Sequence, residues 1–214
     1  MKCLLVLLLV FCSSVFSQDI DPEKFSHLPK RAQKVILPFA EKFIDSNPSV
    51  GGGIPEDFSI MVTNEQVDAS LEDVWKVYTQ ISPKEVWAGP LVNFAMAIDR
   101  EDGKIYYDSD DVPDFKVGLK TLNYLHILGQ YIAVGLELTR IDEINHVVEI
   151  AYLEGGASKG KQILKFWDYE GSTFIQHTSI YKSDSKFRDK MLYPLCHRMT
   201  AKEHHQTMLD LINP

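Results

Sequence analysis

Hydrophobic side chains recur every three or four positions in the segment that begins near residue 26. The positions concerned are Leu28, Ala32, Val35, Ile36, Phe39, Ala40, Phe43 and Ile44. This spacing places them on one side of a helix, so an amphipathic helix is predicted here. Pro38 interrupts the pattern with a residue that has no amide hydrogen to donate, which predicts a kink or two short helices. The glycines at 51–53 then predict a flexible connection, so residues 18–55 form a helical segment followed by a glycine-rich linker.

A different pattern begins at about residue 57, where polar and apolar positions alternate as they do in a strand up to residue 67. Ser70 follows as a helix N-cap, with the acidic Asp73 three positions later. Ser82 repeats the start signal at once, because Pro83 stands at the first helical position. Two consecutive short helices are therefore predicted after the first strand.

The chain from residue 91 to 183 has the alternation of strands separated by turn residues. The predicted strands cover residues 91–99, 104–109, 115–128, 130–141, 145–154, 161–169 and 172–183. From about Ser185 to Ile212 the alternation is absent, which predicts one long helix. Because the predicted sheet is highly apolar, neither of its faces can be left exposed to water. The final helix is therefore expected to cover one face. The predicted fold class is α+β, with an antiparallel sheet of about seven strands.

The stretch VDASLEDVWKVYTQISPKEVW, residues 67–87, follows the first strand, and the long terminal helix stands at the other end of the predicted domain. This motif and order of elements resemble the START/Bet v1/polyketide-cyclase superfamily of helix-grip proteins (SRPBCC). The resemblance covers roughly Phe58 to Ile212 and implies that residues 56–214 form a curved sheet around the C-terminal helix and an apolar cavity. Members of this superfamily bind lipids, steroids or polyketides, or act on them. Residues 18–55 depart from its pattern, and they either cover the cavity or pack on its back.

The first seventeen residues combine Lys2 with a short apolar run, which is typical of a secretory signal peptide cleaved before Gln18. The run is too short to cross a membrane, so a secreted, extracellular protein without an integral membrane span is predicted. Removal of this segment leaves Cys196 as the one cysteine. It is either a buried thiol or one half of an intermolecular disulfide, so the oligomeric state stays open. The net charge of −8, or −9 without Lys2, argues against a nucleic-acid partner.

Three of the seven histidines lie within HRMTAKEHH, residues 197–205. On a helix, His197, Ala201, His204 and Met208 share the apolar stripe, so these imidazoles are predicted to face the core or the cavity. One interpretation is structural, in which a carbonyl or a tyrosine hydroxyl satisfies each ring. The other interpretation is a functional site.

Other polar groups on predicted inward faces favour the functional interpretation. Alternation places Glu154 with Tyr152, and His126 with Tyr124, while His177 lies on a strand whose buried side is ambiguous. His126, Glu154, His177 and His197 are therefore candidate ligands of one zinc or iron ion. The candidate ligand-binding residues are Tyr124, Tyr152, His177, His204 and Met208.

Three hypotheses of function follow. The first is a secreted protein that binds a hydrophobic small molecule of lipid, steroid, polyketide or phenolic type in its cavity. The second is an enzyme of the same fold, a metal-dependent hydrolase or an acid/base cyclase or isomerase, with Glu154, His197 and His126 as catalytic residues. The third is a non-catalytic matrix or structural protein that has kept only the fold.

Overall fold

The computed structural model of the chain describes residues 19–53 and 55–212. Its strands form one antiparallel sheet in the order β1-β8-β7-β6-β5-β4-β2-β3. The strands are β1 (Ser59–Val67), β2 (Val92–Asp99), β3 (Ile105–Tyr107), β4 (Leu119–Ile127), β5 (Gln130–Asp142), β6 (Val147–Tyr152), β7 (Lys159–Tyr169) and β8 (Ser172–Lys182). The signal peptide predicted for residues 1–17 lies outside the described residues.

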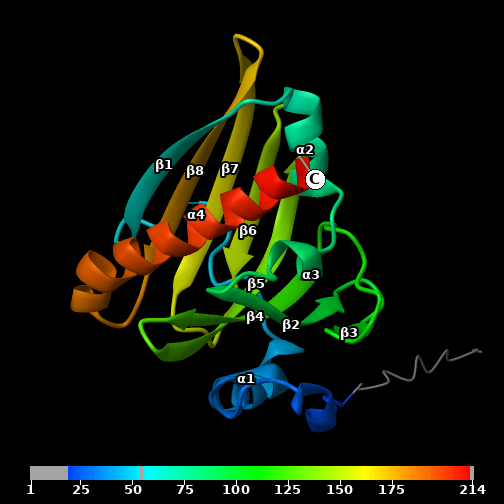
Figure 1. The fold of residues 1–214 in the computed structure, drawn as a ribbon. Helices are drawn as coiled ribbons and strands as arrows, with labels where there is room; N and C mark the ends of the chain where they lie inside the picture. The colour runs from blue at the N-terminus through cyan, green and yellow to red at the C-terminus, as the bar shows by residue number, and fades with distance from the viewer. Residues whose placement is uncertain (1–18, 54, 213–214) are drawn as a thin grey trace, which may run out of the picture.

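The helices are arranged on both sides of the curved sheet (Figure 1). They are η1 (Pro22–Phe25), α1 (Lys30–Phe43), α2 (Leu71–Thr79), α3 (Pro83–Val86), η2 (Arg188–Leu192) and α4 (Tyr193–Ile212). The side chains of Ser70 and Ser82 accept hydrogen bonds from the backbone at the starts of α2 and α3, as predicted. Among the described residues, none of the helices combines the length and the apolar character of a bilayer span.

The long helix α4 lies across the concave face of the sheet, so the helix-grip prediction is confirmed (Figure 1). Its buried residues are Tyr193, His197, Ala201, His205 and Met208, at helical spacings of four, four, four and three. They face the inward side chains of the sheet and of α2, which together form the larger hydrophobic cluster. The buried histidines of α4 therefore lie where this helix and the sheet face one another.

The helix α1 packs on the opposite face of the sheet, on β4 and β5. Leu122 and Tyr124 of β4 belong to the cluster under α1, whereas Leu119 and Leu125 belong to the cluster under α4. The helical part of this segment, η1 and α1, thus packs on the back of the sheet rather than over the concave face. Pro38 lies inside one continuous helix, so the prediction of two short helices is wrong.

Candidate functional site

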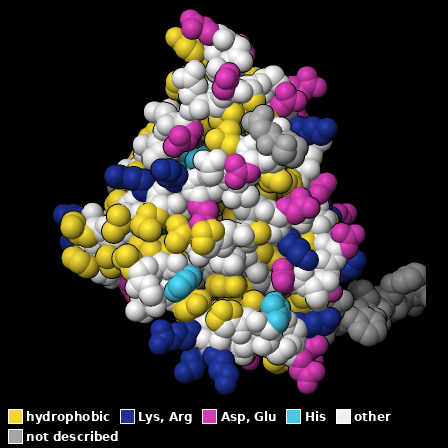
Figure 2. Space-filling view, in the orientation of Figure 1, with side chains coloured by type: hydrophobic (Ala, Val, Ile, Leu, Met, Phe, Trp, Pro, Cys, Tyr) yellow, Lys and Arg dark blue, Asp and Glu magenta, His cyan; other side chains and the backbone are white. Residues whose placement is uncertain are grey.

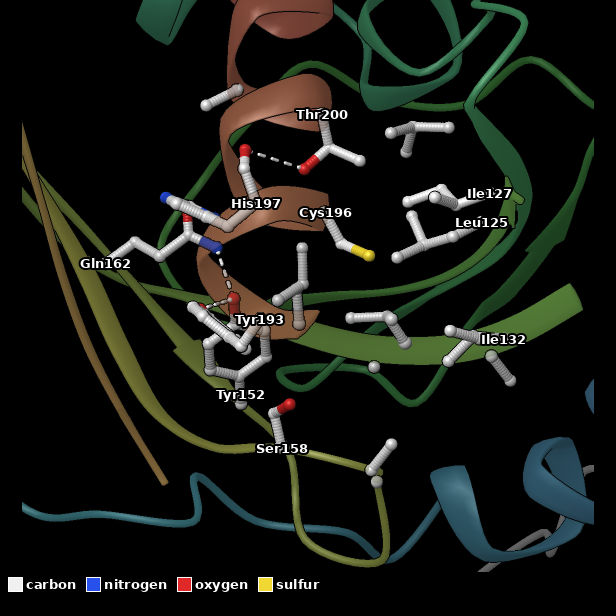
Figure 3. Close-up of a pocket in the computed structure, with 18 of the residues that line it drawn as sticks. Leu125, Ile127, Ile132, Tyr152, Ser158, Gln162, Tyr193, Cys196, His197 and Thr200 are labelled. Carbon is white, nitrogen blue, oxygen red and sulfur yellow. Dashed lines mark hydrogen bonds between the residues drawn. The ribbon is translucent and has the colours of Figure 1, made fainter. Parts of the chain in front are cut away.

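A cavity of about 340 Å³ lies between α4 and the concave face of the sheet. Apolar side chains make most of its wall, and they come from β2, β4, β5, β6 and β7 and from α4. Examples that Figure 3 labels are Leu125, Ile127, Ile132 and Cys196. The volume lies within the roughly 300–1,000 Å³ that small-molecule sites occupy.

One wall of the cavity is polar, and its side chains are hydrogen-bonded to one another (Figure 3). The hydroxyl oxygens of Tyr193 and Tyr152 are 2.6 Å apart. The amide nitrogen of Gln162 donates to the Tyr152 hydroxyl at 2.8 Å. The amide oxygen of Gln162 lies 2.7 Å from Nε2 of His177. A glutamine on β7 thus joins the two tyrosines to a histidine on β8.

The chain of hydrogen bonds continues from His177 into the core between α2 and α4. Nδ1 of His177 lies 3.3 Å from Nε2 of His205, and Nδ1 of His205 lies 2.6 Å from the Tyr78 hydroxyl. Because the Gln162 oxygen only accepts, His177 must carry its proton on Nε2. His205 must then donate from Nε2, and Tyr78 must donate to its Nδ1. The direction of every bond from Tyr78 to Gln162 follows from the orientation of one amide.

Burial keeps the imidazoles of this region neutral, as those hydrogen-bond directions require. Desolvation lowers the pKa of His197 and of His205 to about 4 and that of His204 to about 3. The pKa of His177 is lowered well below its ordinary value, first by burial and then by its three histidine neighbours. Burial also raises the pKa of the Tyr152 and Tyr193 hydroxyls. At neutral pH this wall therefore offers uncharged donors and acceptors.

Two histidines on α4 complete the polar wall. Nε2 of His197 lies 2.8 Å from the Ser179 hydroxyl. Thr200 donates to the His197 backbone carbonyl at 3.1 Å (Figure 3). His204 also lines the cavity, and its buried Nδ1 has no hydrogen-bond partner among the described residues. A buried polar atom without a partner costs free energy, so a ligand group that bonds to it would be stabilised there.

Four of the predicted site residues line this cavity: Tyr152, His177, His197 and His204. The ambiguity of β8 is resolved, because His177 lies on the buried side with Ser179 and Tyr181. Met208 is buried in the cluster between the sheet and α4, but it is not one of the lining residues.

The inward positions predicted for Glu154, His126 and Tyr124 are wrong. The strand β6 ends at Tyr152, and Glu154 is an exposed residue of the following turn. His126 is exposed and stacks on Tyr131, and Tyr124 is buried under α1. The alternation along β4 was correct, but α1 rather than the cavity covers its even-numbered side.

The quartet proposed as a zinc or iron site, His126, Glu154, His177 and His197, is therefore not brought together. No three His, Cys, Asp or Glu side chains of the described residues are arranged to hold a metal ion. Both ring nitrogens of His177 and of His205 are hydrogen-bonded within the chain described above. His177 and His205 are thus satisfied by hydrogen bonds, which agrees with the structural interpretation, whereas Nδ1 of His204 is not.

Four members of the hydrogen-bond chain were missed from the sequence: Tyr78, Gln162, Tyr193 and His205. Tyr193 lies four positions before His197, so the helical stripe would have found it if it had been extended backwards. His205 lies four positions after Ala201 by the same rule. Gln162 has no signal of its own, because glutamine is a common residue on the solvent side of a strand, and here it is half-buried in the cavity wall.

Comparison with known proteins shows a likeness of fold. No family model matches the chain, and no curated protein matches it significantly. The structure is similar to major latex-like protein 151 from Panax ginseng, with a TM-score of 0.55 and 11% identity over 76% of this chain and 100% of that one. It is similar to norcoclaurine synthase from Thalictrum flavum in complex with dopamine and hydroxybenzaldehyde, with a TM-score of 0.53 and 15% identity over 76% and 93% of the chains.

A third similar structure is Ara h 8.0201, with a TM-score of 0.52 and 9% identity over 72% of this chain and 97% of that one. The three are Bet v1-like proteins, so the helix-grip resemblance found in the sequence is confirmed as a fold. At these identities the likeness concerns the fold alone.

Proposed function

We propose that this protein is a secreted carrier that holds a hydrophobic small molecule in the cavity between α4 and the sheet. The observation that carries the proposal is the contrast between an apolar wall and one polar wall whose groups are uncharged. Such a site recognises a mostly apolar ligand and orients its polar end. The ligand would be of lipid, steroid, polyketide or phenolic type.

The polar end of the ligand would lie near His204 and His197. The Nδ1 atom of His204 is free to bond to a ligand hydroxyl or carbonyl, since an imidazole nitrogen either donates or accepts according to its tautomer. An ionised group is disfavoured at this wall, because none of the side chains hydrogen-bonded there is charged and burial of an unpaired charge is costly. Arg188 also lines the cavity, but it is paired with Asp184. The end of the ligand near His204 is therefore neutral in this proposal.

Native mass spectrometry of the protein from its secretion medium tests the carrier proposal. We expect the denatured mass of residues 18–214 and, in the native spectrum, an additional organic mass of a few hundred daltons. Val134→Trp places a large ring at a lining residue and is expected to abolish most of the additional mass. Val117→Trp makes the same change at an exposed residue and should keep it. Equal occupancy of the two variants would contradict the assignment of the cavity.

An acid/base enzyme is the second candidate, because a hydroxyl of the hydrogen-bond chain reaches the cavity at Tyr193 and a similar structure is a synthase. Proton transfer is most efficient when the pKa of the catalytic group is near the working pH. Burial moves the pKa of His197 down to about 4 and that of Tyr193 well up, so both groups are poor at proton transfer near neutrality. This argument favours the carrier.

Incubation of the extracted ligand with the ligand-free protein separates the two candidates. We expect wild type and Tyr193→Phe to return the ligand with its mass unchanged. An enzyme would form a new product, and loss of an acid/base hydroxyl would slow its formation by about 10²–10⁴-fold. Glu154→Gln serves as the control, because Glu154 is exposed outside the cavity.

A further inference from the structure

The helical segment that leads into α4 exposes an unusual set of side chains. Every exposed residue between positions 185 and 203 is either a large hydrophobic or a basic residue. The hydrophobic ones are Phe187, Met191, Leu192 and Leu195, with exposed fractions of 64%, 61%, 39% and 48%. The basic ones are Lys186, Lys190, Arg198 and Lys202. We call these eight residues the entry surface.

The hydrophobic residues of the entry surface form one stripe. Phe187, Met191 and Leu195 are four positions apart, so they lie above one another on the helix. Yellow side chains gather over this end of α4 in Figure 2, with dark blue side chains at their edges. A helix with an apolar stripe and flanking lysines and arginines is typical of segments that lie in a membrane interface.

The charge of the entry surface is opposite to that of the protein. The chain has a net charge of −8, but residues 186–202 contain five basic residues and one acidic residue, Asp189. Of the five, Arg188 is paired with the exposed Asp184 and leaves the other four basic groups to set the local charge. This surface is therefore suited to an anionic partner although the whole protein is acidic.

The entry surface adjoins the mouth of the cavity. Arg188, Leu192 and Cys196 line the cavity from the helix, and Leu128 lines it from the turn between β4 and β5. Leu128 is 66% exposed and has a φ of 52°, a conformation that leucine rarely adopts. The turn between β4 and β5 thus places the exposed side chain of Leu128 at the mouth of the cavity, as η2 places Leu192 there.

We propose that the entry surface docks the protein on an anionic lipid bilayer, with the mouth of the cavity against the membrane. Phe187, Met191 and Leu195 would enter the interface, and the flanking lysines and arginines would contact lipid phosphates. A second copy of the chain fits this surface poorly. A two-fold contact would place the basic residues of one copy near the same residues of the other.

Docking on a membrane does not require a ligand in the cavity, so it is independent of the carrier proposal. If the protein is a carrier, as proposed above, docking would also let the ligand pass between the cavity and the membrane without crossing water. The Val134→Trp variant keeps the two proposals distinguishable, since it alters the cavity and leaves the entry surface unchanged. It is expected to bind vesicles as wild type does.

Vesicle flotation of the secreted protein tests the docking. We expect binding to vesicles of phosphatidylcholine with about one-third phosphatidylserine, weak binding to pure phosphatidylcholine, and a decrease as salt is added. Phe187→Ser with Met191→Ser should weaken the binding about tenfold or more. Lys186→Glu with Lys190→Glu should do the same.

Matched double variants control for the loss of apolar area and of charge elsewhere. Val117→Ser with Ile144→Ser removes two other exposed hydrophobic residues, and Lys30→Glu with Lys34→Glu reverses two exposed lysines of α1. Both are expected to bind vesicles as wild type does. Equal weakening by test and control variants would overturn the proposal. Sedimentation equilibrium gives a second test. If wild type is a dimer and Phe187→Ser with Met191→Ser makes it a monomer, the entry surface binds a second copy of the chain and the proposal is overturned.

Discussion

Acidification from about pH 7.5 to about pH 5 is expected to lower the free energy of unfolding by about 4 kcal/mol or more. His197 and His205 have a pKa of about 4 in the folded protein against 6.5 as the ordinary value, because burial disfavours their charged form. Between these two values the unfolded chain binds more protons than the folded one, so stability falls as the pH falls. At pH 5 each of the two imidazoles accounts for a loss of about 2 kcal/mol in the free energy of unfolding.

The surroundings of the histidines explain why an added proton is so unfavourable. Their hydrogen-bond partners in the described structure are Tyr78, Gln162, Ser179 and one another, none of which carries a negative charge at neutral pH. The pKa values of His177 and His204 are lowered as well, so both add to the effect. The free energy of unfolding therefore has its full value above about pH 7, where these histidines are neutral in both states, and it decreases as the pH falls toward 4.

Urea unfolding at a series of pH values measures this dependence. His205→Gln is expected to reduce the slope of stability against pH, whatever it does to stability at pH 7.5, because one buried titrating group has been removed. His126→Gln removes an exposed imidazole and should leave the slope unchanged. A free energy of unfolding that is the same at both ends of the range would show that these histidines are not buried as described.

Replacement of Gly160 by alanine is expected to destabilise the protein by about 3 kcal/mol or more. Gly160 lies on β7 opposite Tyr181 of β8, with a φ of 125°. A Cβ atom there would lie 1.9 Å from the backbone oxygen of Ile180, and a backbone atom of a paired strand cannot move away at low cost. The clash would separate β7 from β8, the strands that carry Gln162 and His177.

Gly52→Ala is the matched control, because a Cβ atom at Gly52 would meet no atom within 4 Å and the residue has no positive φ. We expect it to change stability by less than about 0.5 kcal/mol. Chemical denaturation of both variants measures the difference. A Gly160→Ala protein as stable as wild type would mean that β7 and β8 are farther apart at this point.

The hydrogen-bond chain shows how far the sequence alone leads toward the site. Helical periodicity correctly placed His197 on the buried face of the last helix, and alternation correctly placed Tyr152 inward. Both results depend on local geometry, which repeats every 3.6 residues in a helix and every two in a strand. His204 lines the cavity as predicted, but the buried stripe itself passes through His205.

The sequence by itself determined the class and order of the elements, the caps at Ser70 and Ser82, the covering of the sheet by the last helix, and the candidate histidines of that helix. These features depend on residues close together in the chain. Only the tertiary structure decided that the even-numbered side of β4 faces α1, that Glu154 lies past the end of β6, and that Gln162 joins Tyr152 to His177. Alternation separates the two faces of a strand but does not say which element covers each, and contacts between distant strands leave no trace in local spacing.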